Sequence, residues 1–214
     1  MASPFLDRLA QGPLLADGAM GTLLFSRGIP FERCFDGLNA TDAGLIEGIH
    51  REYLAAGAGL IETNTFGCNS VRLGVHGRER EVRVLARAGV KIARNAREIA
   101  GTPALVGGSI GPLGKALEPF GPIAPAEAEA GFREEAEALL EGGVDVFVLE
   151  TFQDLTEILA AIRAVKSVTA EVPIVAQMTF GEDGKTRYGH TPALVVRARR
   201  SCRAVCASPR DLVD

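Results

Sequence analysis

Short apolar runs alternate with longer amphipathic stretches along most of this chain. The apolar runs begin near residues 14, 60, 104, 145 and 173, and each repeat takes roughly 30 to 45 residues, the length of a strand–helix unit. The runs are apolar throughout rather than alternating, which is typical of strands buried on both faces of a parallel sheet. The spacing therefore predicts an α/β fold in which helices cover a parallel sheet.

Turn residues and helical periodicity set the expected boundaries of these elements. Asn39-Ala40-Thr41 is expected to cap the first helix, and Asp154 is placed to cap the last one. Residues 27–36 are expected to be irregular. Strands are expected at residues 14–17, 60–66, 104–106, 145–151 and 173–180, and helices at residues 42–56, 78–99, 126–141 and 154–168.

Two architectures fit this spacing: a (β/α)8 barrel and an open, doubly wound sheet. An open sheet concentrates its polar site residues at one switch point, whereas a barrel collects them from the carboxyl ends of many strands. In this sequence, polar residues stand at or near the end of every predicted strand, namely Asp17, Asn64, Ser109, Glu150 and Gln177. This placement favours an incomplete barrel of the TIM-barrel family, with about five to six βα units present.

Composition and charge exclude several classes of protein. The 214 residues carry a net charge of −4, with basic residues interspersed among the acids, so a nucleic-acid partner is not expected. No apolar run approaches the ~20 residues of a membrane span, and the N-terminus lacks the pattern of a signal peptide. We therefore expect no membrane partner and a cytoplasmic location. The four cysteines are too few and too scattered for a disulfide framework.

The first apolar run ends in an acid and a turn with two glycines, Asp17-Gly18-Ala19-Met20-Gly21-Thr22. Gly18 and Gly21 can take a positive φ or approach a ligand closely, which a residue with a Cβ resists. Such a turn can present backbone N–H groups and a carboxylate to a small zwitterion. A plain strand-to-loop turn is the alternative interpretation.

This stretch resembles the opening strand of the homocysteine S-methyltransferase family, which includes the N-terminal domain of cobalamin-dependent methionine synthase. The resemblance covers about residues 5–192 and is strongest to the methyltransferase half of bifunctional proteins that also carry a methylenetetrahydrofolate reductase. Residues 1–192 are thus expected to form a partial barrel of this family. The motifs similar to its later strands are Glu62-Thr63-Asn64-Thr65-Phe66, Gly108-Ser109-Ile110-Gly111-Pro112 and Glu150-Thr151-Phe152-Gln153-Asp154.

The resemblance implies a methyltransferase that moves a methyl group to the thiol of homocysteine and so forms methionine. A carboxylate at the end of an apolar strand is costly unless it meets a cation or a donor. Glu150 matches the family's glutamate that holds the α-ammonium group of homocysteine, and backbone N–H groups of residues 18–20 would meet its carboxylate. The expected substrate-binding residues are Asp17, Gly18, Ala19, Met20, Thr63, Asn64, Ser109, Glu150 and Gln177.

The sequence leaves two points open. The residues alone allow a second interpretation, in which Thr63 and Asn64 only satisfy the exposed end of their strand. The methyl donor does not follow from the sequence either. Within the family it is methylcobalamin, S-methylmethionine, S-adenosylmethionine or betaine, and a folate-linked route is expected to need further domains.

The resemblance breaks at the zinc site of the family. Zinc deprotonates the substrate thiol by coordinating its sulfur, and relatives hold the metal with three cysteines, in an Asn-Cys step and a Gly-Gly-Cys-Cys turn. This sequence contains neither motif, so we expect zinc to be the family's cofactor without its ligands in this chain. Cys202 and Cys206 lie four residues apart, but two thiolates fall short of the three ligands that a catalytic zinc needs.

Residues 193–214 change abruptly to a sequence rich in arginine and cysteine, where the family has a helix and a strand. We expect this tail to be a frameshifted or truncated stretch, and a basic surface tail is the alternative. The chain is then a fragment that is inactive by itself. A different class of function, a non-catalytic barrel fragment that binds an amino acid, is the second hypothesis.

Five strands cannot close an eight-stranded barrel, so parallel strand edges are expected to stay unpaired. Such edges pair with other chains, and we therefore predict an unstable product that aggregates or self-associates. Circular dichroism and size-exclusion chromatography of the purified chain test this prediction. A cooperative melt from a clean monomer would contradict it.

Overall fold

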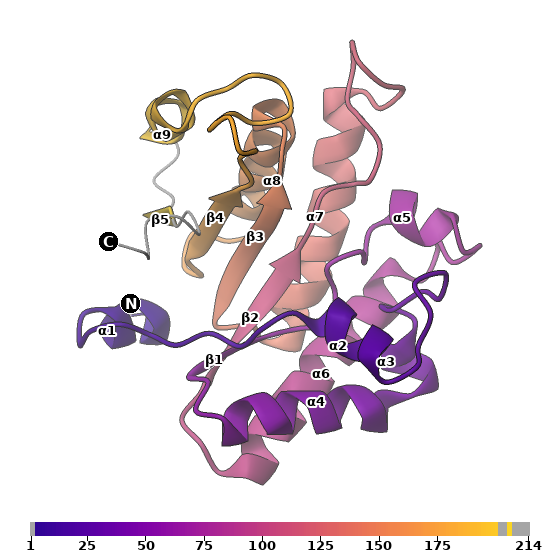
Figure 1. Ribbon diagram of the computed structural model, residues 1–214, viewed down its shortest axis with the longest axis vertical. Helices are drawn as coiled ribbons and strands as arrows, with labels where there is room; N and C mark the ends of the chain where they lie inside the picture. The colour runs from indigo at the N-terminus through magenta and orange to yellow at the C-terminus, as the bar shows by residue number, and fades with distance from the viewer. Residues whose placement is uncertain (1–2, 201–204, 207–214) are drawn as a thin grey trace.

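The computed structural model describes residues 3–200 and 205–206, which form one parallel sheet with helices around it (Figure 1). Within these residues the sheet has five strands in sequence order, and every neighbouring pair is parallel. The strands are β1 (Leu60–Glu62), β2 (Leu105–Ile110), β3 (Val146–Phe152), β4 (Ile174–Met178) and β5 (Val205–Cys206).

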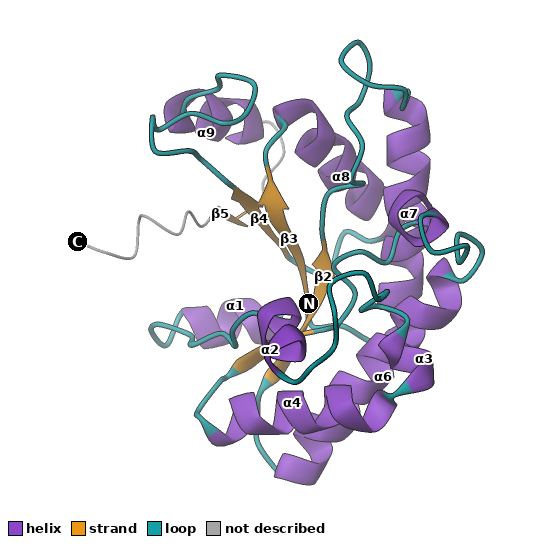
Figure 2. Ribbon diagram, turned by 45° about the vertical axis from the view of Figure 1, so that its right-hand side comes forward, coloured by secondary structure: helices purple, strands orange, loops and turns teal. Residues whose placement is uncertain are grey.

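Long helices precede and connect the strands, and they lie along the outer face of the curved sheet (Figure 2). Sequential parallel strands with helices on one side form part of a (β/α)8 barrel, as predicted. None of the helices in the described part of the chain is long and apolar enough to cross a membrane. The long helices are α4 (Ala43–Ala55), α6 (Val82–Ala100), α7 (Pro125–Gly142), α8 (Leu155–Val168) and α9 (Pro192–Arg200).

The first predicted strand makes a single bridge instead of a ladder. Ala16 pairs with Leu60, and the Asp17 N–H donates to the Leu60 carbonyl at 2.9 Å, which sets this segment beside β1. The chain then leaves the sheet, because α2 (Met20–Ser26) begins directly after the glycine turn. Residues 14–17 thus take the place of the first barrel strand, and the prediction of a full strand there is wrong.

The two predicted helix caps have different outcomes. Asp154 caps α8 as predicted, because its carboxylate accepts a backbone N–H of the first turn at 2.8 Å. The cap of α4 is Asp42 rather than residues 39–41, since its carboxylate accepts a first-turn N–H at 3.3 Å. The residues that were expected to cap belong to a short helix of their own, α3 (Leu38–Thr41).

Short elements with little periodic signal escape prediction from the sequence. They include α1 (Pro4–Leu9) and α5 (Ser70–Gly74). α9 begins at residue 192, and with β5 it continues the alternation of helix and strand by one unit, in which β5 pairs with β4. Cys202 and the side chain of Cys206 lie outside the described residues. The origin of the tail stays a prediction.

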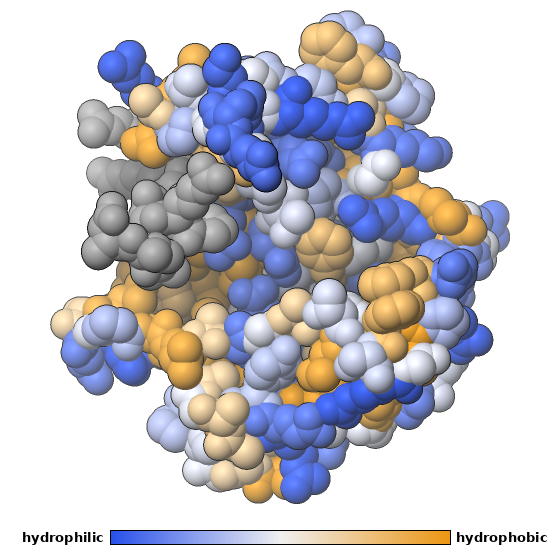
Figure 3. Space-filling view, viewed as in Figure 1, coloured by the Kyte–Doolittle hydropathy of each residue, from blue (hydrophilic) through white to orange (hydrophobic). Residues whose placement is uncertain are grey.

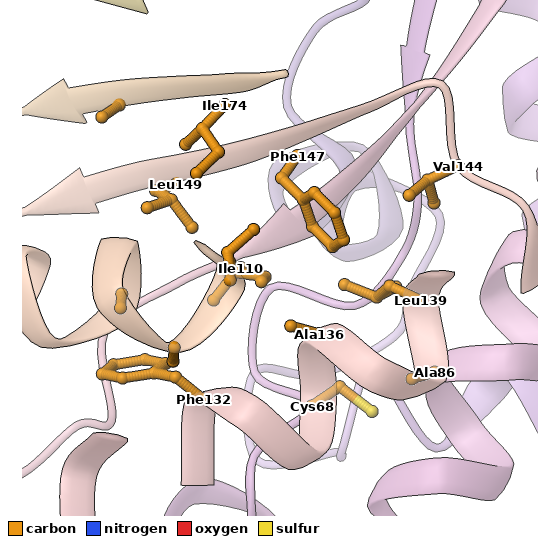
Figure 4. Packing of buried hydrophobic residues seen from close by; sticks show 14 of the residues in the cluster. Cys68, Ala86, Ile110, Phe132, Ala136, Leu139, Val144, Phe147, Leu149 and Ile174 are labelled. Atoms are coloured by element: carbon orange, nitrogen blue, oxygen red, sulfur yellow. The ribbon is translucent and has the colours of Figure 1, made fainter. Parts of the chain in front are cut away.

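Alternation along the strands gives the sheet two different faces. Phe147 and Leu149 of β3 point outward and pack against the helices in a continuous apolar core (Figure 4). Val148 points inward, where a smaller cluster includes Phe5 of α1. Polar side chains occupy the carboxyl end of this inner face, namely Glu62, Ser109, Glu150 and Gln177.

His50 is a buried polar residue on α4. Its side chain is fully buried, and neither ring nitrogen has a hydrogen-bond partner in the described part of the chain. Burial lowers the pKa of His50 to about 4, because the imidazolium would lose its hydration without gaining a partner. The neutral ring therefore belongs to the core.

Protonation of His50 should destabilise the fold in mild acid. The unfolded imidazole takes up a proton below about pH 6.5, whereas the folded one resists protonation until about pH 4. The chain should lose on the order of 2–3 kcal/mol of unfolding free energy between these values. Urea unfolding of wild type and His50→Leu measures this, since their difference should change by that amount. A pH-independent difference would contradict it.

Candidate functional site

A cavity of about 760 Å³ lies at the carboxyl ends of β1 to β4, beside the start of α2 and the loop that follows it. The structure thus brings together residues that lie far apart in the sequence, from Ala16 to Gln177. All the residues expected to bind substrate line this cavity: Asp17, Gly18, Ala19, Met20, Thr63, Asn64, Ser109, Glu150 and Gln177.

Three carboxyl groups, those of Asp17, Glu62 and Glu150, converge at one end of the cavity. The Asp17 carboxylate accepts the backbone N–H of Glu62 at 3.0 Å. Glu62 and Glu150 face inward from β1 and β3, on either side of β2, and their carboxyl groups are within hydrogen-bonding reach of each other. Glu62 is absent from the predicted binding residues although it begins one of the quoted motifs, and its inward position in a short buried strand explains its presence here.

A bulge in β3 aims Glu150 into the cavity. The register between β3 and β4 shifts between Leu149 and Phe152, and Thr151 has a φ of 63°, a left-handed conformation that β-branched residues avoid. The Ser109 hydroxyl donates to the Glu150 carboxylate at 2.6 Å and fixes it in place. Strained backbone beside a fixed carboxylate supports a functional role for this position.

Loss of hydration and mutual repulsion shift the protonation of this acidic end. Burial raises the pKa of Asp17 to about 7, with a smaller opposing effect of the Glu62 N–H and a further rise from the charge of Glu150. Burial, followed by the charges of Glu150 and Asp17, raises the pKa of Glu62 well above its usual value. The acidic end therefore retains protons near neutral pH.

The described chain supplies no counter-ion for these groups. Ion pairs form elsewhere in residues 3–200, and none of them includes Asp17, Glu62 or Glu150. A buried carboxylate without a partner is unfavourable. The site is therefore suited to a cation with hydrogen-bond donors that comes from outside the chain.

Thr63 and Asn64 line the cavity, but their polar atoms already have partners. The Asn64 amide donates to the Phe35 carbonyl at 2.8 Å and to the Asn39 side-chain oxygen at 2.9 Å. The Thr63 hydroxyl accepts the Ser109 N–H at 3.1 Å. These contacts support the interpretation in which both residues complete the end of their strand, and a role in binding stays a prediction.

Gly18 is needed for space rather than for an unusual backbone angle. Neither Gly18 nor Gly21 has a positive φ, so that part of the prediction does not apply. A Cβ on Gly18 would lie 3.0 Å from the Tyr53 hydroxyl oxygen, and this hydroxyl donates to the Ala19 carbonyl at 3.2 Å. The close approach is therefore made to a side chain of α4, which holds the turn in position.

The other end of the cavity carries mixed charge, from Cys34, Asp36, Arg72 and His76. Burial raises the pKa of Asp36 to about 6, although the Gly67 N–H donates to its carboxylate at 2.9 Å and opposes the shift. No pattern in the sequence marks these residues, because they come from an irregular loop and the short α5 region without a common spacing. They are the functional candidates that sequence reasoning misses.

The described residues do not fit a zinc site. Among residues 3–200 and 205–206, no group of three His, Cys, Asp or Glu side chains is placed to hold a metal ion. Cys34 is half-buried and Cys68 is buried, and burial raises the pKa of both thiols, which opposes the thiolate form that zinc requires.

An aromatic cluster borders the cavity. Phe25 and Phe31 stack with their ring centroids 4.3 Å apart, and the Phe31 ring also lies 6.0 Å from that of Phe35. Phe25 is 51% exposed and Phe31 is 58% exposed, while Phe31 and Phe35 line the cavity. The space-filling view shows apolar side chains over the loop between α2 and α3 (Figure 3). The cavity thus combines an apolar rim with an acidic inner end.

Comparison with known proteins connects this cavity to one family. The sequence model of the homocysteine S-methyltransferase family matches residues 14–209, and so extends past residue 192. The methionine synthases of Mycobacterium tuberculosis and Mycobacterium leprae are each 36% identical to this chain, over 197 and 199 residues. Each match covers 86% of this chain but only 16% of the relative, so the chain spans about a sixth of the length of these relatives.

Solved structures show the same fold. The oxidised form of the homocysteine methyltransferase MmuM from Escherichia coli superposes with a TM-score of 0.84 at 25% identity, and the match covers 97% of this chain and 77% of MmuM. The metallated form of MmuM gives a TM-score of 0.82 at 24% identity, over 96% of this chain and 77% of MmuM. The predicted partial barrel is thereby confirmed.

Asp17→Asn should stabilise the folded chain at alkaline pH. The pKa of Asp17 rises from 3.8 to about 7 on folding, so the folded state loses stability as the pH rises through this range. Asparagine still accepts the Glu62 N–H but cannot ionise. At pH 8 the variant should exceed wild type by on the order of 1–3 kcal/mol in unfolding free energy, and near pH 4 the gain should vanish.

Urea unfolding at the two pH values measures this difference. Asp7→Asn, on the exposed part of α1, is the control and should change the unfolding free energy little. An Asp17→Asn variant that is no more stable than wild type at pH 8 would show that ionisation of this carboxyl group does not strain the fold.

Proposed function

Because the chain belongs to the homocysteine S-methyltransferase family, we propose that its cavity binds homocysteine for methyl transfer to the thiol. The reaction forms a bond between the homocysteine sulfur and the methyl carbon of a donor, breaks the bond that held this carbon, and releases the thiol proton. The product is methionine. For a chain that spans 16% of the methionine synthases it resembles, this activity is a proposal.

One observation carries the proposal: the acidic inner end of the cavity has no counter-ion within the described chain. An α-ammonium group is a compact cation with three donors, and hydrogen bonds between charged groups are the strong ones. We assign the ammonium group to Glu150, whose carboxylate accepts a hydrogen bond of 2.6 Å from the Ser109 hydroxyl. Asp17 is the second partner of the ammonium group.

The substrate carboxylate is assigned to the backbone N–H groups of Gly18, Ala19 and Met20. These groups precede or begin α2, so no carbonyl of an earlier helical turn accepts from them. They line the same cavity as Glu150 and Gln177. The two charged ends of one amino acid therefore have separate partners in this cavity.

Methyl transfer also needs a thiolate, because an unassisted thiol has a pKa near ~8.5. We assign amino-acid binding to the described residues and no residue to the activation of the thiol, since these residues do not fit a zinc site. Zinc as the cofactor, and methylcobalamin or a folate-linked carrier as the methyl donor, remain expectations that the family resemblance implies. A cytoplasmic location and self-association through the sheet edges also remain predictions.

The second candidate function is a barrel fragment that binds an amino acid without catalysis. Two observations favour it: the acidic end of the cavity is suited to an ammonium group, and the described residues include no metal-binding cluster. Methylation of homocysteine by the purified chain, abolished by a chelator, would decide in favour of the enzyme. Metal-independent amino-acid binding without turnover would favour the fragment.

Glu150→Gln should weaken the binding of methionine by about 10- to 100-fold, because a hydrogen bond to a charged group contributes about 1.5–3 kcal/mol. Methionine is the suitable probe, since it keeps the ammonium and carboxylate groups and has no thiol that needs a metal. Isothermal titration calorimetry on the whole chain measures the affinity.

The matched control is Glu157→Gln on α8. Its carboxyl group is buried, accepts the Leu113 N–H at 2.8 Å and lies outside the cavity, so this variant should bind methionine like wild type. Equal affinities for wild type and Glu150→Gln would contradict the assignment of the ammonium group. A wild-type chain that binds neither methionine nor homocysteine would refute the proposed function.

A further inference from the structure

Glu62 has no role in the binding assignment above, although it sits at the centre of the acidic end. Its side chain lines the cavity from the inner face of β1, and its backbone N–H donates to Asp17 at 3.0 Å. Its carboxyl group reaches that of Glu150. Two carboxyl groups can make such a contact favourably only when one of them carries a proton.

The surrounding donors indicate which group carries it. The Ser109 hydroxyl donates to the Glu150 carboxyl group at 2.6 Å, so Glu150 already acts as a hydrogen-bond acceptor. In the described part of the chain no N–H or hydroxyl group donates to the Glu62 carboxyl group. Glu62 is thus the member that carries the proton and donates it to Glu150.

We propose that Glu62 and Glu150 hold one proton between them in the ligand-free site, and that the α-ammonium group of a bound amino acid displaces this proton to solvent. This inference rests on the proposed function. It makes Glu62 a specificity-determining residue, because the shared proton leaves only when a ligand brings its own positive charge.

The exchange balances in charge and in atoms. The ligand-free pair consists of one carboxylate and one carboxylic acid, with a charge of −1. The bound state consists of two carboxylates and one ammonium group, again with a charge of −1, and one proton has moved to the solvent. A ligand without an amino group leaves the proton in place and keeps only the partners of its carboxylate, the N–H groups of residues 18–20.

Other titratable and charged groups face this pair from the neighbouring elements. Asp17 is the nearest, and Tyr53 of α4 lies close to Asp17. Asp17 also retains a proton near neutral pH, so an experiment has to separate its titration from that of Glu62. The remaining groups that line the cavity are Arg33, Cys34, Asp36, Arg72 and His76.

Calorimetry of methionine binding in two buffers with different ionisation enthalpies counts the protons released per ligand. At pH 6.5 the wild-type chain should release about one proton more per methionine than Glu62→Gln, because glutamine has no proton to lose and the contribution of Asp17 is common to both. The desamino analogue 4-(methylsulfanyl)butanoate should release none from wild type. Methionine is used rather than homocysteine because it has no thiol proton.

Two control variants make the result specific. Glu157→Gln should release as many protons as wild type, and Asp17→Asn should still release a proton for each methionine that it binds. The inference would be overturned if Glu62→Gln released as many protons as wild type. It would also be overturned if proton release were lost in Asp17→Asn but kept in Glu62→Gln. Circular dichroism establishes that each variant is folded.

A second measurement covers the case in which Glu62→Gln does not fold. In Asp17→Asn, which removes the titration of Asp17, the affinity for methionine should still rise with pH below neutrality, by up to about tenfold per pH unit, if the shared proton leaves on binding. A pH-independent affinity would overturn the inference while leaving the proposed function intact. A wild-type chain that does not bind methionine would instead refute the proposed function, and this inference with it.

Discussion

Negative charge that the described chain does not neutralise determines the character of this site. The carboxyl groups of Asp17, Glu62 and Glu150 meet where parallel strands end, half-buried and without an ion pair among the described residues. Their repulsion destabilises the folded chain, and a protein retains such a group of charges when a ligand offsets it. Stability is thus lower in the absence of a cationic ligand, and binding restores it.

The fold creates this charge by a simple repetition. Parallel strands in sequence order bring all their carboxyl ends to one edge, and alternation within each strand sends every second side chain inward. On β3 the outward residues complete the apolar core against the helices, while the inward series ends at Glu150. The bulge at Thr151 then turns this carboxylate into the cavity. Core and site are therefore opposite faces of the same strands.

Much of this arrangement could be predicted from the sequence, because long apolar runs and amphipathic helices leave strong signals. The runs at residues 104–106, 145–151 and 173–180 all overlap strands, although β2 extends four residues beyond its run, and Glu150 stands out as an acid that ends an apolar run. Glu62 does not stand out in the same way, because its strand is only three residues long and its partner in space is 88 positions away, at Glu150. The single bridge at Ala16 depends on tertiary packing that no local pattern records.

The most direct measurement is a crystal structure of the chain with bound methionine. The account predicts the amino nitrogen within hydrogen-bonding distance of the Glu150 carboxylate, and the methionine carboxylate at the N–H groups of residues 18–20. Methionine bound with its amino group at the opposite end of the cavity, near Arg72, or bound outside the cavity altogether, would contradict it.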